Sequence, residues 1–196
     1  MRAMLLDSLA AFILFAAALS AWFLSAQAKA SSRVNIRFAA MLFAALAVAH
    51  VPSLLSAQSL EFSVALIVAP LGATALALGV SAFLVRPLPA GVAALAMALA
   101  LAAGLAAALS GVPAYAGLCQ MACVLLTLAA GAQQPARLMS VALAALPLLC
   151  GALCLMDGAL NGAELFFAAA LIGAASQKRV ERAHDSSARP AVSRAG

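Results

Sequence analysis

The four cysteines of this chain form two pairs on two neighbouring hydrophobic segments. Cys119 and Cys123 lie in "LCQMACVLL", and Cys150 and Cys154 lie in "PLLCGALCLMDG". Because residues four apart share one face of a helix, each pair would place two thiols side by side. Four thiols brought together could ligate a soft metal ion or carry out thiol–disulfide exchange. The CxxxC spacing and the lack of a nearby basic residue to activate a thiol favour the simpler interpretation, in which these cysteines are small apolar residues that fill space.

Two prolines at similar depth mark a candidate ligand site in the same layer as the cysteines. Pro70 and Pro147 stand inside hydrophobic segments, where proline removes a backbone hydrogen bond and bends a helix. Matching breaks of this kind are typical of transporter binding sites, although prolines in membrane helices also serve packing alone. The sequence therefore offers one ligand site near the outer end of the helices, formed by Pro70, Gly72, Cys119, Cys123, Pro147, Cys150 and His50.

Ionisable residues are confined to the ends of the hydrophobic segments. Four carboxylates, His50 and Tyr115 fall near one end, where they could bind a cation, but we expect the carboxylates to be solvated: Asp7, Glu61, Asp157 and Glu164. Ion pumps and proton-coupled carriers usually keep a charged group in the middle of a span, and the central thirds here contain none. The polar residues that do lie deep are Thr74, Gln120, Thr127 and Ser140. We therefore expect no proton relay, no cofactor and no enzymatic activity.

The composition indicates that these residues are carried on membrane-spanning helices. The 196 residues are 67% hydrophobic and 9% charged, with a mean hydropathy of +1.13. Soluble domains contain about 45–50% apolar and about 25% charged residues. Apolar runs of about 20 residues can cross a bilayer as helices, and backbone groups in lipid must be satisfied within the segment. The sequence therefore predicts an all-α, polytopic transmembrane bundle.

We predict seven spans followed by a polar tail. The spans cover residues 3–26, 38–55, 62–85, 89–110, 113–131, 138–156 and 163–177, so the bundle occupies residues 1–177. The short connections favour antiparallel packing of successive helices. Residues 178–196, "KRVERAHDSSARPAVSRAG", are basic and polar, and we expect them to form a disordered cytoplasmic tail.

The positions of the basic residues predict the orientation. They follow the odd-numbered spans, and of the eleven lysines and arginines only Arg2 lies at the other end. Basic residues in short loops mark the cytoplasmic side, which places the N-terminus outside and the C-terminus in the cytoplasm of a bacterial inner membrane. Cleavage of the first span as a signal sequence near Ala28 would invert this pattern, and we do not favour it.

The fourth span is the most uniformly apolar segment of the chain. It has no polar side chain before Ser110, and its small residues Ala96, Ala100, Gly104 and Ala108 recur every four residues. Small residues let helix backbones approach closely in lipid. We therefore predict that this helix is central and that Gly104→Ile destabilises the bundle.

These features favour a non-enzymatic accessory or scaffold subunit. Its expected partners are the lipid bilayer and other membrane proteins or copies of itself, and the sequence shows no nucleic-acid motif. The basic tail would be attracted to anionic headgroups. Two alternatives stay open: a permease for a small solute or a soft metal ion, and a membrane thiol–disulfide relay.

Overall fold

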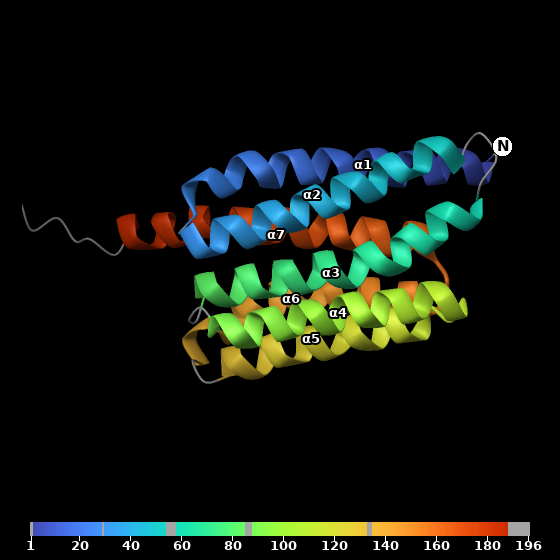
Figure 1. The fold of residues 1–196 in the computed structure, drawn as a ribbon. Helices are drawn as coiled ribbons and strands as arrows, with labels where there is room; N and C mark the ends of the chain where they lie inside the picture. The colour runs from blue at the N-terminus through green and yellow to red at the C-terminus, as the bar shows by residue number, and fades with distance from the viewer. Residues whose placement is uncertain (1, 29, 54–57, 85–87, 133–134, 188–196) are drawn as a thin grey trace, which may run out of the picture.

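The computed structural model describes residues 2–28, 30–53, 58–84, 88–132 and 135–187, and nearly all of them are helical. The helices are α1 (Arg2–Leu24), α2 (Ala30–Ser53), α3 (Gln58–Leu84), α4 (Ala90–Ser110), α5 (Ala114–Ala132), α6 (Pro135–Met156) and α7 (Leu160–Ser187), with a 3-10 turn η1 (Ser25–Gln27) after α1. They lie side by side in one bundle, and successive helices run in opposite directions (Figure 1). The described residues contain no strand, so the prediction of an all-α fold is confirmed.

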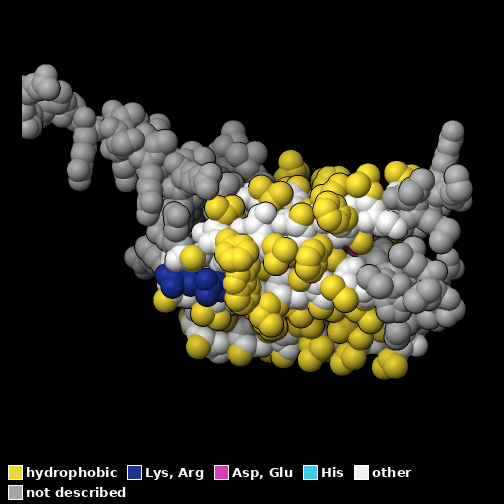
Figure 2. Space-filling model, turned by 90° about the horizontal axis from the view of Figure 1, so that it is seen from above, with side chains coloured by type: hydrophobic (Ala, Val, Ile, Leu, Met, Phe, Trp, Pro, Cys, Tyr) yellow, Lys and Arg dark blue, Asp and Glu magenta, His cyan; other side chains and the backbone are white. Residues whose placement is uncertain are grey.

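Three of the helices are long and apolar enough to cross a membrane. Their apolar stretches are Ser32–Ala49 in α2, Phe62–Ala82 in α3 and Ala90–Ser110 in α4. Shorter apolar stretches lie in the other four helices: Ser8–Leu24, Ala114–Ala129, Ala145–Met156 and Leu160–Ala175. Apolar side chains cover much of the visible face, and arginine or lysine side chains gather at one end of it (Figure 2). The protein thus has the character of a membrane protein.

The centre of the bundle is α3. It packs against α2, α4, α5, α6 and α7, and its residues from Gly72 to Ala82 are all buried. By contrast, α4 packs mainly against α3 and α5 and leaves most of its surface exposed, including Leu109 at 88%. The prediction that the fourth helix is central is therefore wrong. An apolar side chain is as stable against lipid as against another helix, so a lack of polar residues does not report burial.

The close approach predicted for Gly104 is present. A Cβ atom on Gly104 would lie 2.9 Å from the Cα of Ile67 and 2.9 Å from the carbonyl oxygen of Leu66, so the backbones of α4 and α3 touch there. Ala100 and Ala107 lie on the same face of α4 and are fully buried. The small residues thus join α4 to the bundle, although α4 is an outer helix.

α2 and α7 extend furthest beyond the apolar runs from which they were predicted. α2 begins at Ala30 rather than at residue 38, because its polar first turns find partners. The hydroxyl of Ser32 donates to the carbonyl oxygen of Gly79 on α3 at 2.8 Å, and the Arg33 guanidinium donates to the carbonyl oxygen of Ala28 at 2.8 Å. α7 continues to Ser187, and so includes residues 178–187, which were expected to be disordered.

The extension of α7 has a simple cause. Adding residues to an existing helix is far easier than starting a new one, and "KRVERA" at residues 178–183 consists mostly of strong helix formers. Residues 188–196, the remainder of the predicted tail, lie outside the described residues.

Candidate functional site

The two cysteine pairs face different neighbours. α5 and α6 are joined by a hydrogen bond in which the side-chain Nε2 of Gln120 donates to the carbonyl oxygen of Leu148 at 2.8 Å. The thiol of Cys123 points instead toward α3, where it accepts a hydrogen bond from the Thr74 hydroxyl at 3.3 Å. Cys154 faces α7, since its Sγ lies 3.1 Å from the position that a Cβ on Gly162 would take.

The arrangement that could have made a four-thiol centre is therefore not assembled. All four cysteines lie within the described residues, and none is in a disulfide. No three of the described histidine, cysteine, aspartate and glutamate residues are grouped so that they could hold a metal ion. A similar depth in two helices does not bring side chains together, because the rotation of each helix about its axis decides which face meets the other.

The two prolines do not interrupt their helices. Pro70 is buried within α3, Pro147 is half-buried within α6, and both helices continue through them. The space beside the prolines is filled by rings: a Cβ on Gly72 would lie 2.8 Å from the ring of Phe43, and a Cβ on Gly151 would lie 2.7 Å from the ring of Phe167.

Those two rings form the aromatic centre of the core. Phe43 on α2 and Phe167 on α7 are both fully buried and stack with their centroids 4.9 Å apart and their planes 22° apart. Gly72 therefore makes room for an aromatic side chain rather than for a ligand. Cys150 is half-buried on α6, and the side chain of His50, with those of Asp7 and Glu61, lies outside the described part of the chain.

A cavity of about 160 Å³ lies between the amino-terminal half of α4 and the facing parts of α3 and α5. It is partly open to the surface. The described residues of its walls are mainly apolar, and one of them, Cys123, belongs to the site expected from the sequence. The lining residues are Thr74, Ala77, Leu78, Ser81, Leu88, Val92, Ala96, Cys123, Leu126 and Thr127.

The cavity wall carries three hydroxyl groups in different states. The Thr74 hydroxyl reaches across to the thiol of Cys123, and the Thr127 hydroxyl donates to the carbonyl oxygen of Cys123 at 3.0 Å. The Oγ of Ser81 has no hydrogen-bond partner, although the residue is only 3% exposed. Leaving a buried hydroxyl unsatisfied costs about 1–3 kcal/mol, which makes Ser81 the exceptional polar group of this wall.

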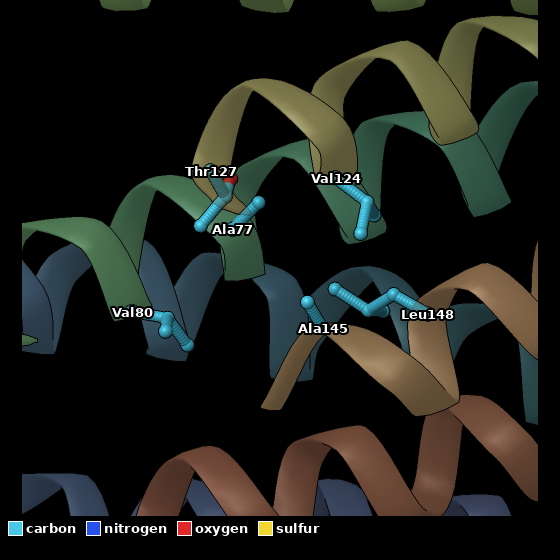
Figure 3. Close-up of a pocket in the computed structure, with 6 residues that line it drawn as sticks. All are labelled: Ala77, Val80, Val124, Thr127, Ala145 and Leu148. Carbon is cyan, nitrogen blue, oxygen red and sulfur yellow. The ribbon is translucent and has the colours of Figure 1, made fainter. Parts of the chain in front are cut away.

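A second, much smaller cavity of about 10 Å³ adjoins the first between α3, α5 and α6. Figure 3 shows the side chains around it: Ala77, Val80, Val124, Thr127, Ala145 and Leu148. It is about the size of one water molecule, which would need two or more polar partners. Among the described side chains of this wall only Thr127 is polar, and its hydroxyl is already bonded, so these residues offer a water molecule no second partner.

The acidic residues at the other end of the bundle do not behave alike. Asp157 is exposed, in line with its position at a helix end, and so is the neutral Tyr115. Glu164 was expected to be solvated and is instead fully buried. The difference arises because α7 begins at Leu160, so Glu164 lies in the second turn of the helix, beside the inward-facing Ala163 and Phe167.

A polar cluster at the α1–α2 connection was missed by the sequence analysis. The guanidinium of Arg37 lies over the ring of Trp22, 4.9 Å from its centroid, and its Nε donates to the Ser25 hydroxyl at 3.3 Å. Ser25 in turn donates to the carbonyl oxygen of Trp22 at 2.7 Å. A lone tryptophan at the end of an apolar run, followed by arginines, is the available signal, because such rings favour the membrane interface.

Comparisons with known proteins give no relative from which a function could be inferred. No family model matches the chain, and neither the curated proteins nor the solved structures gave a match. The case for a function therefore depends on the fold and on the contacts described above.

Proposed function

We propose that the chain is a seven-span protein of a bacterial inner membrane, with its N-terminus outside and its C-terminus in the cytoplasm. The alternating direction of the helices supports an odd number of crossings. Arg33 and Arg37 stand at the end of the bundle where α3 finishes and α4 starts, which we call the basic end. Under the rule that short basic loops stay inside, the basic end faces the cytoplasm.

Reporter fusions test this orientation directly. A cytoplasm-active reporter joined after Gly196 should be active, and a periplasm-active reporter inserted after Val112, in the α4–α5 connection, should be active as well. Activity of the periplasmic reporter at Gly196 would contradict the proposed orientation.

We further propose that the protein is a non-enzymatic accessory subunit that docks against a helix of another membrane protein. The observation that carries this proposal is a second row of small residues on α4. Ala94, Ala98, Ala102 and Ala106 recur every four residues and are all exposed. They lie on the side of α4 opposite to the small residues that pack closely against α3.

The contact between α4 and α3 shows what such a row does. At Gly104 it brings the two backbones into contact, which is how helices associate in lipid without a hydrophobic driving force. The exposed row is flanked by Leu95, Leu99, Leu105 and Leu109, which would fill the spaces on either side of a partner helix.

Purification in mild detergent tests the docking role. The double variant Ala98→Leu/Ala102→Leu should lose a membrane-protein partner that the wild type retains, because larger side chains keep the backbones apart. The control is Ala16→Leu, on the exposed surface of α1, which should retain the partner. Retention of the partner by the double variant would contradict the proposal. Recovery of only a second, differently tagged copy would also contradict it and show self-association.

The two alternatives from the sequence fare differently against the fold. A thiol relay between α5 and α6 would need a cysteine of each helix to meet, and the contacts of Cys123 with α3 and of Cys154 with α7 give no support to a relay through these two thiols. A permease needs a place to hold a solute, and the cavity between α3, α4 and α5 offers one.

A further inference from the structure

We propose that the cavity between α3, α4 and α5 binds a small uncharged molecule that has an apolar body and one hydrogen-bonding group, and that Ser81 pairs with that group. This inference does not depend on the docking role of α4, which concerns the opposite side of that helix.

The size and the walls of the cavity define the body of the ligand. A dry cavity of about 150 Å³ lined by aliphatic and aromatic side chains is large enough to bind benzene. The cavity here is about 160 Å³, and its apolar lining includes the large side chains of Leu78, Leu88, Val92 and Leu126. The expected occupant is therefore a molecule with a single ring or a short branched chain.

The hydroxyl groups define the polar part of the ligand. A serine in a helix commonly donates to the carbonyl oxygen one turn earlier. Thr127 bonds in this way to Cys123, whereas Ser81 makes no such bond. The Oγ of Ser81 is itself enclosed, so the side chain must rotate toward the cavity before a ligand hydroxyl or carbonyl can supply the partner that the protein does not. None of the described residues that line the cavity is charged, so a charged ligand held among them would lose its hydration without compensation, and we infer an uncharged one.

The ligand has a route into the cavity. Leu88 and Val92, which line it, are 41% and 49% exposed. The cavity therefore opens beside the start of α4, at the basic end of the bundle. An amphiphile that partitions into the membrane would reach it sideways, without crossing the packed centre around α3.

Cys123 provides a reporter within the wall. The test uses a variant in which the other three cysteines are replaced with alanine, and follows the alkylation of Cys123 by N-ethylmaleimide in detergent. Cyclohexanol should slow this reaction more than methylcyclohexane, which has a similar size and shape but no hydroxyl. In the same background, Ser81→Ala should weaken protection by cyclohexanol about fivefold, the effect expected from one neutral hydrogen bond.

Matched variants separate binding from general effects of the alcohol. Ala96→Phe should fill the cavity and abolish protection, whereas Ala16→Phe, the same substitution on the exposed surface of α1, should leave it unchanged. A second background with Cys150 as the sole thiol should show no protection. Equal protection at Cys123 and Cys150, or equal effects of the two probes, would overturn the proposal.

A second readout does not depend on the thiol. Saturation-transfer NMR with cyclohexanol on the protein with all four cysteines intact should show contact that Ala96→Phe removes and Ala16→Phe retains. Absence of this difference would overturn the proposal even if alkylation could not be measured.

Discussion

Replacement of Gly104 should loosen the attachment of α4 to α3. A Cβ at this position would lie 2.9 Å from Ile67 Cα, 2.9 Å from the Leu66 carbonyl oxygen and 3.2 Å from the Ile67 carbonyl oxygen. All three atoms belong to the backbone, so no flexible side chain can move aside. Ordinary contacts of a Cβ are 3.4–4 Å. The two helices must therefore separate by about 0.5–1 Å, which forfeits a quarter to a half of the dispersion attraction of each affected contact.

The resulting loss can be estimated from the behaviour of overpacked cores. Added methyl or methylene groups in a tightly packed site cost about 1–3 kcal/mol. In water, Gly→Ala would regain about 1 kcal/mol of helix propensity, but this gain shrinks when the dissociated helix stays helical in detergent. We expect Gly104→Ala to cost about 2 kcal/mol and Gly104→Ile to cost more, because its branched side chain meets the same backbone.

Gly91 supplies the control on the same helix. A Cβ there would meet nothing within 4 Å, so Gly91→Ala should leave stability unchanged within about 0.5 kcal/mol. The measurement is thermal unfolding in mild detergent, with expression in the membrane as a second readout. Gly104→Ile with the same unfolding temperature as Gly91→Ala would refute the close approach of α4 to α3.

Three further predictions follow from buried or interfacial contacts. Gln120→Leu should change the free energy of unfolding by less than about 1 kcal/mol, because it removes an unsatisfied Oε1 together with the bond to Leu148. Gln120→Ala should cost about 2 kcal/mol, because it leaves a cavity, and unfolding in detergent compares the two variants. Phe43→Ala should cost about 3–5 kcal/mol, since the ring is fully buried in the aromatic centre, and a wild-type unfolding curve would rule this out. Arg37→Gln should cost about 0.5–1 kcal/mol and shift the fluorescence of Trp22, the only tryptophan, so an unchanged emission spectrum would contradict the stacking.

The helical elements were foreseeable because their signal is length and polarity. Apolar runs between basic and acidic connections predicted all seven helices in order. The start of α2 and the C-terminal end of α7 were not foreseeable from hydropathy, because a helix continues past its apolar part wherever polar residues find partners. The bond from Ser32 to Gly79 is such a partner, and it joins residues far apart in the sequence.

The inward faces of the helices were not foreseeable for a different reason. Helices that are apolar all round have no amphipathic pattern to show which side is buried. The cysteines illustrate this. The orientation of α5 about its axis directs the Cys123 side chain to α3, and the orientation of α6 directs the Cys154 side chain to α7. The cavity beside Ser81 escaped prediction because a membrane serine ordinarily bonds to its own helix, and nothing in the sequence distinguishes one that does not.

The central position of α3 has a consequence for biogenesis. This helix leaves the ribosome third, yet four of its five neighbours, α4, α5, α6 and α7, are made after it. The surface of α3 that is buried in the finished bundle must therefore contact lipid or the insertion machinery until the last helix has been synthesised. A chain truncated within α5 to α7 would leave that surface without its partners, which would expose unfinished molecules to quality-control proteases while the completed bundle is protected.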